Sequence, residues 1–182
     1  LRGDGSVLGW GYNEHGEATV PGSATNVMAV AAGYYHSLAL RDDGTVLGRG
    51  WDTDNQVTAP VSVSNVVAIA AGPYHSMAIR TDGTIVGWGW NGYGQTTIPA
   101  NATNVVAFSA GYSHNLALRG DGAVIGWGYG DYGQTTVPTG LSTLNLPITV
   151  SGVVDEDNPG VYELTYSATN ALGAVGAVSR TV

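Results

Sequence analysis

The chain has 182 residues, of which 43% are hydrophobic and 11% are charged, so it can bury a sizeable core and is not a disordered segment. Its six cations are all Arg, against fourteen Asp and Glu, which gives a formal net charge of −8. An acidic chain without Lys repels a phosphate backbone, so we expect no nucleic-acid partner. Cys is absent, which excludes disulfides, thiolate metal sites and cysteine nucleophiles. Apolar runs stay well below about 18 residues, so we expect no membrane insertion.

The chain repeats itself every 39 residues. His36, His75 and His114 keep this step, and an Asp-Gly pair, an Asn and a Pro recur with it. The further positions are Asp4, Asp43, Asp82 and Asp121; Asn26, Asn65 and Asn104; and Pro21, Pro60, Pro99 and Pro138. A period of this size is typical of repeat architectures that stack one small unit on the next.

Each unit reads as four short strands, shown best by residues 65–99. Apolar runs at 66–71, 75–79 and 84–90 are separated by Gly72-Pro73 and by Asp82-Gly83, a strong hairpin signal. Residues 95–98 form a fourth, short run that ends at Pro99. The third run alternates bulky residues with glycines, and we expect a neighbouring sheet to fill the flat glycine side. The pattern predicts an all-β fold, a partial β-propeller of four-stranded antiparallel blades.

The repeated motif A-A-G-x-x-H-S-x-A-[LI]-R-x-D-G-x-[VI]-x-G-W-G resembles the regulator of chromosome condensation repeat, a propeller family. The loop W-G-W-N-G-Y-G-Q is similar to that family's loop as well. The resemblance covers residues 1–141, with repeats at 1–40, 41–79 and 80–118 and a half repeat at 119–141. It implies a propeller of the bacterial secreted type. About three and a half repeats fall short of a closed ring, so we expect a piece of a longer propeller, with closure through other chains as the alternative.

The repeat ends near residue 141, and residues 142–147 read as a linker. Strand-like runs follow at 148–154, 161–169 and 174–182, the second with clean alternation. The run P-G-V-Y-E-L-T-Y-S-A-T-N-A-L-G is similar to the closing half of immunoglobulin-like domains in bacterial surface proteins. The resemblance implies a secreted or cell-surface location. Between the runs, Asp155, Glu156 and Asp157 precede Pro159-Gly160, which favours a turn and leaves a calcium site as the alternative.

Repeated polar residues have structural explanations that compete with functional ones. A residue that recurs in every blade usually builds the blade, so we expect His36, His75 and His114 to be turn residues hydrogen-bonded to backbone rather than metal ligands. The Asp of each Asp-Gly pair is expected to hold its turn. Arg49 stands where Trp10, Trp88 and Trp127 stand in the other repeats. We expect it near solvent, with its stem over apolar surface.

Candidate binding residues lie in the loops after the third strand of each repeat, where the copies differ most. Equivalent loops of a propeller lie on one side, so their aromatic and acidic residues are expected to form one binding surface. Alternatively, the first aromatic of each loop packs between blades. The candidates are Tyr12, Glu14, Trp51, Asp52, Asp54, Trp90, Tyr93, Tyr129, Asp131 and Tyr132. The Gly-x-x-His turns supply a second aromatic group: Tyr34, Tyr35, Tyr74 and Tyr112.

These features favour a non-enzymatic extracellular module that binds a protein or a glycan, without metal or cofactor. One alternative is a structural surface protein that self-associates through open blade faces. Another is a secreted lyase or glycosidase that uses loop carboxylates such as Glu14, Asp52 or Asp131, although no pair stands out at the spacing that glycosidase chemistry needs.

Overall fold

The computed structural model describes residues 1–138, 148–151, 163–169 and 175–181. Residues 27–128 form three antiparallel sheets of three strands each, and every sheet follows the order of the sequence. We call them the first, second and third blade. Their strands are β1 (Val27–Ala32), β2 (His36–Arg41) and β3 (Val46–Gly50); β4 (Val66–Ala71), β5 (His75–Arg80) and β6 (Ile85–Gly89); and β7 (Val105–Ala110), β8 (His114–Arg119) and β9 (Val124–Gly128).

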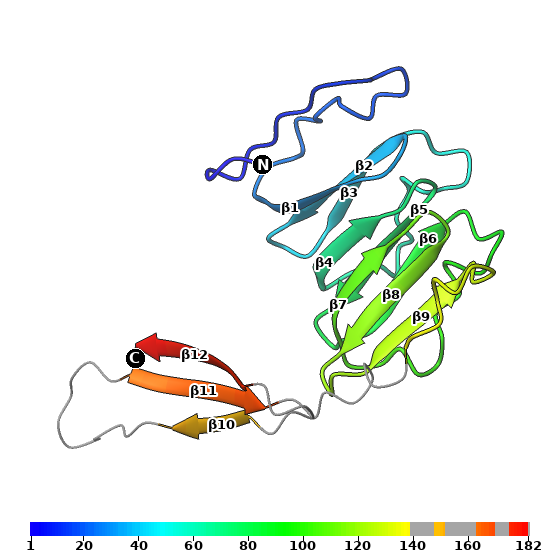
Figure 1. Ribbon diagram of the computed structural model, residues 1–182. Coiled ribbons are helices and arrows are strands. Elements are labelled where there is room, and N and C mark those ends of the chain that lie inside the picture. The colour runs from blue at the N-terminus through cyan, green and yellow to red at the C-terminus, as the bar shows by residue number, and fades with distance from the viewer. Residues whose placement is uncertain (139–147, 152–162, 170–174, 182) are drawn as a thin grey trace.

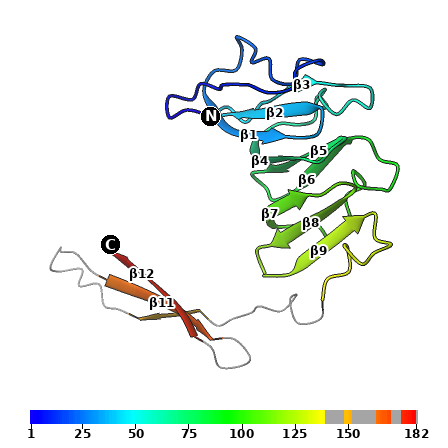
Figure 2. The same ribbon diagram turned by 45° about the horizontal axis from the view of Figure 1, so that its top comes forward.

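The three blades stack in sequence order, and the N-terminal segment runs beside the first blade without forming a strand (Figures 1 and 2). The all-β prediction is confirmed, and the architecture is that of a partial propeller. Among the residues that the structure describes, none belongs to a helix long and apolar enough to cross a membrane.

Each blade is held by the turns that the sequence predicted. In the first blade, the Oδ1 atom of Asp43 accepts hydrogen bonds from the Thr45 backbone N–H, at 3.0 Å, and from its hydroxyl, at 2.6 Å. Gly44 takes a φ of 77°, a left-handed conformation in which glycine has no Cβ to clash. Asp4, Asp82 and Asp121 hold equivalent turns. The structural interpretation of the Asp-Gly pairs is therefore confirmed.

The predicted fourth strand is wrong. Residues 95–97 form a turn and a bend, and residues 95–98 make no ladder with β6. The reason is a competing acceptor within the loop, because the Thr96 N–H donates to the Oδ1 atom of Asn91 at 2.9 Å. Asp52 does the same in the first blade and accepts from the N–H of Val57 at 2.7 Å. A side chain that caps these amides removes donors that a fourth strand would use.

The glycines of the third strands face this same loop, which corrects the expectation that a neighbouring sheet fills their flat side. A Cβ atom added to Gly126 would lie 2.6 Å from the carbonyl oxygen of Thr135. One added to Gly87 would lie 3.0 Å from the Cα atom of Thr96. The loop backbone of each repeat therefore lies directly on its own third strand, and only glycine leaves room for it.

The hydrophobic core lies between blades rather than within them. Leu38 and Leu40 of β2 pack with Val66, Ala78 and Trp88 of the second blade. At the next junction, Met77 and Ile79 of β5 occupy one cluster with the residues Val105, Ala117 and Trp127 of the third blade. Stacking against a neighbour thus buries the apolar face that a single three-stranded sheet would expose.

In the third blade, the apolar side chains of the middle strand are exposed. Leu116 and Leu118 of β8 correspond to Leu38 and Leu40 by the 39-residue step, yet they are 38% and 40% exposed, against 1% for each residue of the first pair. The middle strand of the third blade therefore presents an apolar face without a neighbouring blade among the described residues.

The C-terminal sheet is built from β10 (Ile148–Ser151), β11 (Glu163–Thr169) and β12 (Val175–Thr181), all antiparallel, with Tyr166 opposite both Val150 and Val178. All three fall within predicted runs. The predicted linker 142–147 and the acidic segment Asp155, Glu156 and Asp157 lie outside the described residues, so the choice between a turn and a calcium site stays open.

Candidate recognition surface

Both groups of candidate loops lie at the same end of the blades. β2 and β3 are antiparallel, with His36 opposite Gly50, so the turn before β2 and the loop after β3 meet at one edge. The Trp51 N–H donates to the carbonyl oxygen of Tyr35 at 2.8 Å and fixes the two segments together. Equivalent bonds join Trp90 to Tyr74 and Tyr129 to Ser113, each at 2.9 Å. In the sequence these loops form two separate groups. The antiparallel pairing of the second and third strands brings the two groups together at one end of each blade.

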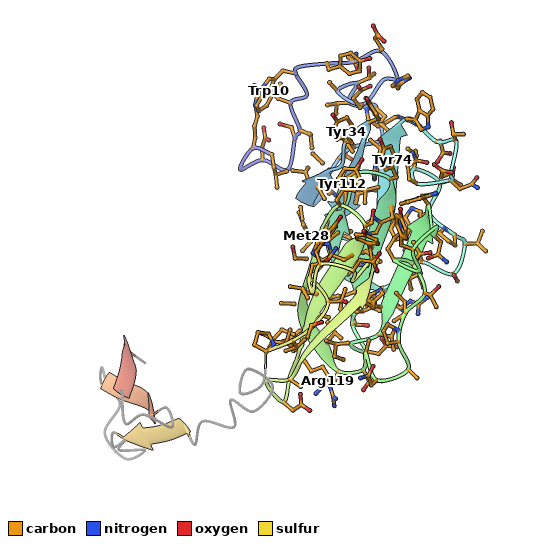
Figure 3. The ribbon with its side chains drawn as sticks, turned by 45° about the vertical axis from the view of Figure 1, so that its right-hand side comes forward. Trp10, Met28, Tyr34, Tyr74, Tyr112 and Arg119 are labelled. Carbon is orange, nitrogen blue, oxygen red and sulfur yellow. The ribbon has the colours of Figure 1, made fainter. Side chains whose placement is uncertain are left out.

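Their side chains form one continuous set of rings across all three blades, which we call the aromatic face. Ring centroids of Tyr34 and Tyr74 lie 6.3 Å apart, and those of Tyr74 and Tyr112 lie 6.2 Å apart. These three turn tyrosines lie close together in Figure 3. Further ring contacts at 6.4 Å or less link the other members. The aromatic face consists of Tyr12, His15, Tyr34, Tyr35, Trp51, Tyr74, Trp90, Tyr93, Tyr112, Tyr129 and Tyr132.

Exposure differs along this face. Tyr132 is 87% exposed, and Tyr34 and Tyr112 are each 62% exposed. Trp90 and Tyr129, the first aromatics of their loops, are half-buried and contact rings on both sides. The alternative in which first aromatics pack away from solvent therefore holds in part for these two, while Tyr12 is 56% exposed. A half-buried layer supports an exposed layer of rings.

Two of the four candidate carboxylates, Asp52 and Glu14, are engaged in hydrogen bonds within their own loops. Asp52 accepts from two backbone N–H groups through Oδ1 and from the Thr58 hydroxyl through Oδ2, at 2.6 Å. Glu14 accepts from the Tyr12 hydroxyl at 2.6 Å, and this bond raises the pKa of Tyr12 to about 12. Burial and then the charge of Asp131 raise the pKa of Tyr129.

Charge is distributed unevenly between the two ends of the blades. Arg41, Arg80 and Arg119 end the second strands, opposite the aromatic face, and Figure 3 shows Arg119 far from the labelled tyrosines. Arg41 and Arg119 pair there with Asp43 and Asp121. Arg49 is exposed, as expected, near the end of β3. The acidic candidates at the aromatic end therefore meet few cations within residues 1–138.

The repeated histidines link one blade to the next, and the prediction that they bond to turn backbone is wrong. The Nε2 atom of His36 lies 2.9 Å from the Ser76 hydroxyl of the second blade. That hydroxyl donates to the carbonyl oxygen of Gln56 at 2.7 Å, so it accepts from His36, which carries its proton on Nε2. Trp88 donates to the same carbonyl at 3.0 Å.

The next junction repeats this link with an amide in place of the hydroxyl. His75 Nε2 donates to the Oδ1 atom of Asn115 at 2.9 Å, and Asn115 donates to the carbonyl oxygen of Gln95 at 2.7 Å. Trp127 also donates to Gln95. A signal was present in the sequence, because Ser or Asn follows each of these histidines and recurs with the same step. The described residues contain no group of three or more potential metal ligands.

Burial makes this link sensitive to acid. Desolvation lowers the pKa of His36 from 6.5 to about 4, and desolvation also lowers the pKa of His75. Both rings are therefore neutral at pH 7, as donation through one nitrogen requires. The Nδ1 atoms of both rings are buried without a hydrogen-bond partner, so a proton placed there has nothing to receive it.

We predict that the blades lose stability as the pH falls from about 6.5 to about 4. The folded-state pKa of His36 lies below the unfolded value, so the unfolded chain takes up the proton first and the stability present above pH 6.5 declines on acidification. The loss from His36 is on the order of 3 kcal/mol. Urea unfolding at pH 7 and pH 4.5 measures it. His36→Gln should shrink the difference and His15→Gln should retain it; an unchanged pH difference in His36→Gln contradicts the assignment.

Stacked antiparallel sheets with a 39-residue step define the class of the protein, a partial β-propeller built from sequence repeats. The family model of the regulator of chromosome condensation (RCC1) repeat matches residues 28–56, 66–95 and 105–134. The chain belongs to the RCC1 repeat family. The model of the bacterial surface protein Ig-like domain matches residues 122–182. Its first part overlaps the third blade, where β9 pairs with β8.

Solved structures agree on the fold. The CRINKLY WD40 ectodomain of the Arabidopsis thaliana receptor kinase ACR4 aligns over 70% of this chain with 22% identity and a TM-score of 0.60. Prp20p from Saccharomyces cerevisiae aligns over 93% with 21% identity and a TM-score of 0.53, and human WBSCR16 over 83% with 23% identity and a TM-score of 0.51. The alignments span 46%, 46% and 47% of those proteins. A search of the curated proteins finds no match.

Proposed function

We propose that the protein is a non-enzymatic recognition module at the cell surface, which binds a protein or a glycan through the aromatic face. The observation that carries the proposal is the continuity of exposed rings across three blades at one end of the scaffold. Tyrosine and tryptophan give large contact areas at low entropic cost, which is why binding surfaces are rich in them. The match to a bacterial surface Ig-like domain supports the location.

The extent of the aromatic face favours a protein ligand over a short glycan. Tyr34, Tyr74 and Tyr112 come from different blades, so a ligand that contacts all of them spans the stack. Many of the rings also meet one another edge to face, as Trp90 and Tyr93 do at an interplanar angle of 88°. Their edges and hydroxyls are then as available as their flat surfaces, whereas glycan binding relies on exposed ring faces.

The engagement of Asp52 and Glu14, two of the carboxylates on which the enzymatic alternative depends, argues against it. A general acid or base needs a carboxyl group free to exchange a proton with substrate. Asp52 has both oxygens in loop hydrogen bonds, and Glu14 is held by Tyr12. These groups position loops, so we infer that the surface recognises rather than transforms its ligand.

The expected result of removing exposed rings is loss of binding with retention of the fold. Binding partners are first selected from arrays of extracellular proteins and of glycans, and affinity is then measured for Tyr112→Ala and Tyr132→Ala. Each of these exposed rings should be worth at least about tenfold in affinity, as hot-spot aromatics are. Trp10→Ala is the matched control, since Trp10 is 83% exposed and makes none of the ring contacts of the aromatic face. Equal losses in control and test variants would contradict the proposal.

A structural role is the second candidate, and the open face of the third blade favours it. Leu116 and Leu118 are exposed where an inner strand is otherwise covered. Light scattering on the samples used for binding distinguishes the roles, because self-assembly would give a mass that rises with concentration whether or not the rings are removed.

A further inference from the structure

The negative charge of residues 1–138 is concentrated at the aromatic end of the blades. Five carboxylates lie in the loops of that end, against one cation, Arg49, near the end of β3. These carboxylates are Glu14, Glu17, Asp52, Asp54 and Asp131. The other five carboxylates of residues 1–138 share the opposite end with four Arg residues, so the charges there nearly balance. The excess of negative charge therefore accompanies the aromatic face.

The carboxylates at the aromatic end have no cationic partner within residues 1–138. The ion pairs of this part of the chain join Arg41 to Asp43 and Arg119 to Asp121, both at the opposite end. Figure 3 shows Arg119 far from the labelled tyrosines. Charges of one sign gathered on one surface give a potential that attracts a partner of the opposite sign and speeds its association. A cationic ligand would neutralise this charge.

In the third blade, one of these carboxylates belongs to a group of tyrosines. The ring centroid of Tyr129 lies 4.7 Å from that of Tyr93 and 5.9 Å from that of Tyr132. Asp131 follows in the same loop, and its charge, after burial, raises the pKa of the Tyr129 hydroxyl. Asp131 is exposed, and Tyr93 and Tyr132 are 52% and 87% exposed. The carboxylate and the rings are thus open to a ligand together.

The loop after β3 repeats this combination in the first blade. Trp51 is 38% exposed and is followed by Asp52 and Asp54. Asp52 holds the loop through its hydrogen bonds. Asp54 contributes its backbone N–H to the loop, donating to the Oε1 atom of Gln56 at 3.0 Å, and its carboxylate makes no hydrogen bond within residues 1–138. A second carboxylate is therefore free beside an exposed ring.

A carboxylate beside exposed aromatic rings suits an arginine side chain. The face of a tyrosine or tryptophan ring attracts a cation that lies within about 6 Å of its centroid. The guanidinium group of arginine is planar, so it stacks on such a ring while its N–H groups donate to a carboxylate, whereas the ammonium group of lysine is a compact point charge. Tyrosine, tryptophan and arginine also dominate the binding energy of protein interfaces.

We propose that the aromatic face binds a protein that presents arginine side chains, one against Tyr132 and Asp131 and another against Trp51 and Asp54. This proposal rests on the proposed function and specifies the chemistry of the partner. Charge attraction brings the partner to the face, and stacking on the rings distinguishes arginine from other cations.

A fluorescein-labelled peptide with the sequence GSRGSRGSRGSRGS tests the proposal by fluorescence anisotropy with the full chain. We expect saturable binding. Citrulline in place of each arginine keeps the shape of the side chain but removes its charge, and it should weaken binding at least about tenfold. Lysine in place of each arginine should weaken binding about threefold, because it keeps the charge and loses the stacking. Raising NaCl from about 20 to about 200 mM should also weaken binding.

Matched protein variants locate the interaction. Asp54→Asn combined with Asp131→Asn should weaken peptide binding at least about fivefold, and Tyr132→Ala should weaken it as well. Asp42→Asn is the control, because Asp42 is exposed at the opposite end of the first blade and its replacement removes a charge of the same sign. No saturable binding up to about 1 mM, equal binding of the citrulline peptide, or an equal loss per charge removed in Asp42→Asn overturns the proposal.

A partner selected from the protein array separates this proposal from the proposed function. If Tyr112→Ala weakens binding of that partner while the variant with Asp54→Asn and Asp131→Asn binds it unchanged, the aromatic face is a binding surface but its partner is not recognised through cations. That result overturns only the choice of arginine. If Tyr112→Ala leaves binding of the partner unchanged, the proposed function itself is wrong.

Discussion

Replacement of Trp88 by alanine is expected to lower the free energy of unfolding by about 3–5 kcal/mol. Trp88 is 5% exposed and packs in the cluster that joins the first two blades. Its Nε1 atom also donates to the carbonyl oxygen of Gln56 at 3.0 Å, so the variant loses a buried hydrogen bond in addition to packing. Urea unfolding at pH 7 measures the change.

Trp10→Ala is the matched control for this prediction. Trp10 occupies the same repeat position as Trp88, but it is 83% exposed and lies in the N-terminal segment. Its removal should change stability by no more than about 0.5 kcal/mol, as at most surface positions. Similar losses for the two variants would show that the repeat position matters more than the neighbouring blade, contrary to the fold described above. Trp88→Phe separates packing from the hydrogen bond and should cost less than alanine.

Leu38→Ala is expected to cost about 2–5 kcal/mol, because Leu38 is 1% exposed and packs between the first and second blades. The cavity that it leaves is lined by β-sheet side chains of two blades, which restricts collapse around it. The midpoint of urea unfolding should fall, and the slope should stay the same if the blades unfold together.

Leu116→Ala is the corresponding control in the third blade. Leu116 has the position of Leu38 within its repeat but is 38% exposed, so little transfer free energy is lost on truncation. We expect a cost of less than about 1 kcal/mol. A cost equal to that of Leu38→Ala would mean that the open face is covered in solution, and it would strengthen the self-assembly alternative.

The linkage between blades has a consequence for the recognition surface. His36 lies directly after the turn that carries Tyr34 and Tyr35, and its hydrogen bond to Ser76 fixes the first blade on the second. Tyr74 precedes His75, which links in the same way to the third blade. The buried histidines thus set the spacing of the turn tyrosines, so acidification is expected to loosen the scaffold and the aromatic face together.

The loops show where prediction from sequence reached its limit. A short apolar run such as residues 95–98 fits a strand by composition, and the pattern contains nothing against it. The structure instead gives the Thr96 N–H to Asn91, a local side-chain acceptor. Whether an amide pairs with a strand or with a nearby side chain depends on distances that only the folded loop has.

The sequence by itself determined the repeating all-β unit and its first three strands, because strand alternation, Asp-Gly turns and a fixed 39-residue step each follow from local chemistry. It also supplied the aromatic and acidic residues of the loops. The tertiary structure decided which residues at the same repeat position share the same environment. Leu38 is buried whereas Leu116 is exposed, and Trp88 donates a buried hydrogen bond whereas Trp10 is exposed to solvent. Burial in a stack depends on a neighbouring blade, and no residue's own repeat encodes whether that neighbour is present.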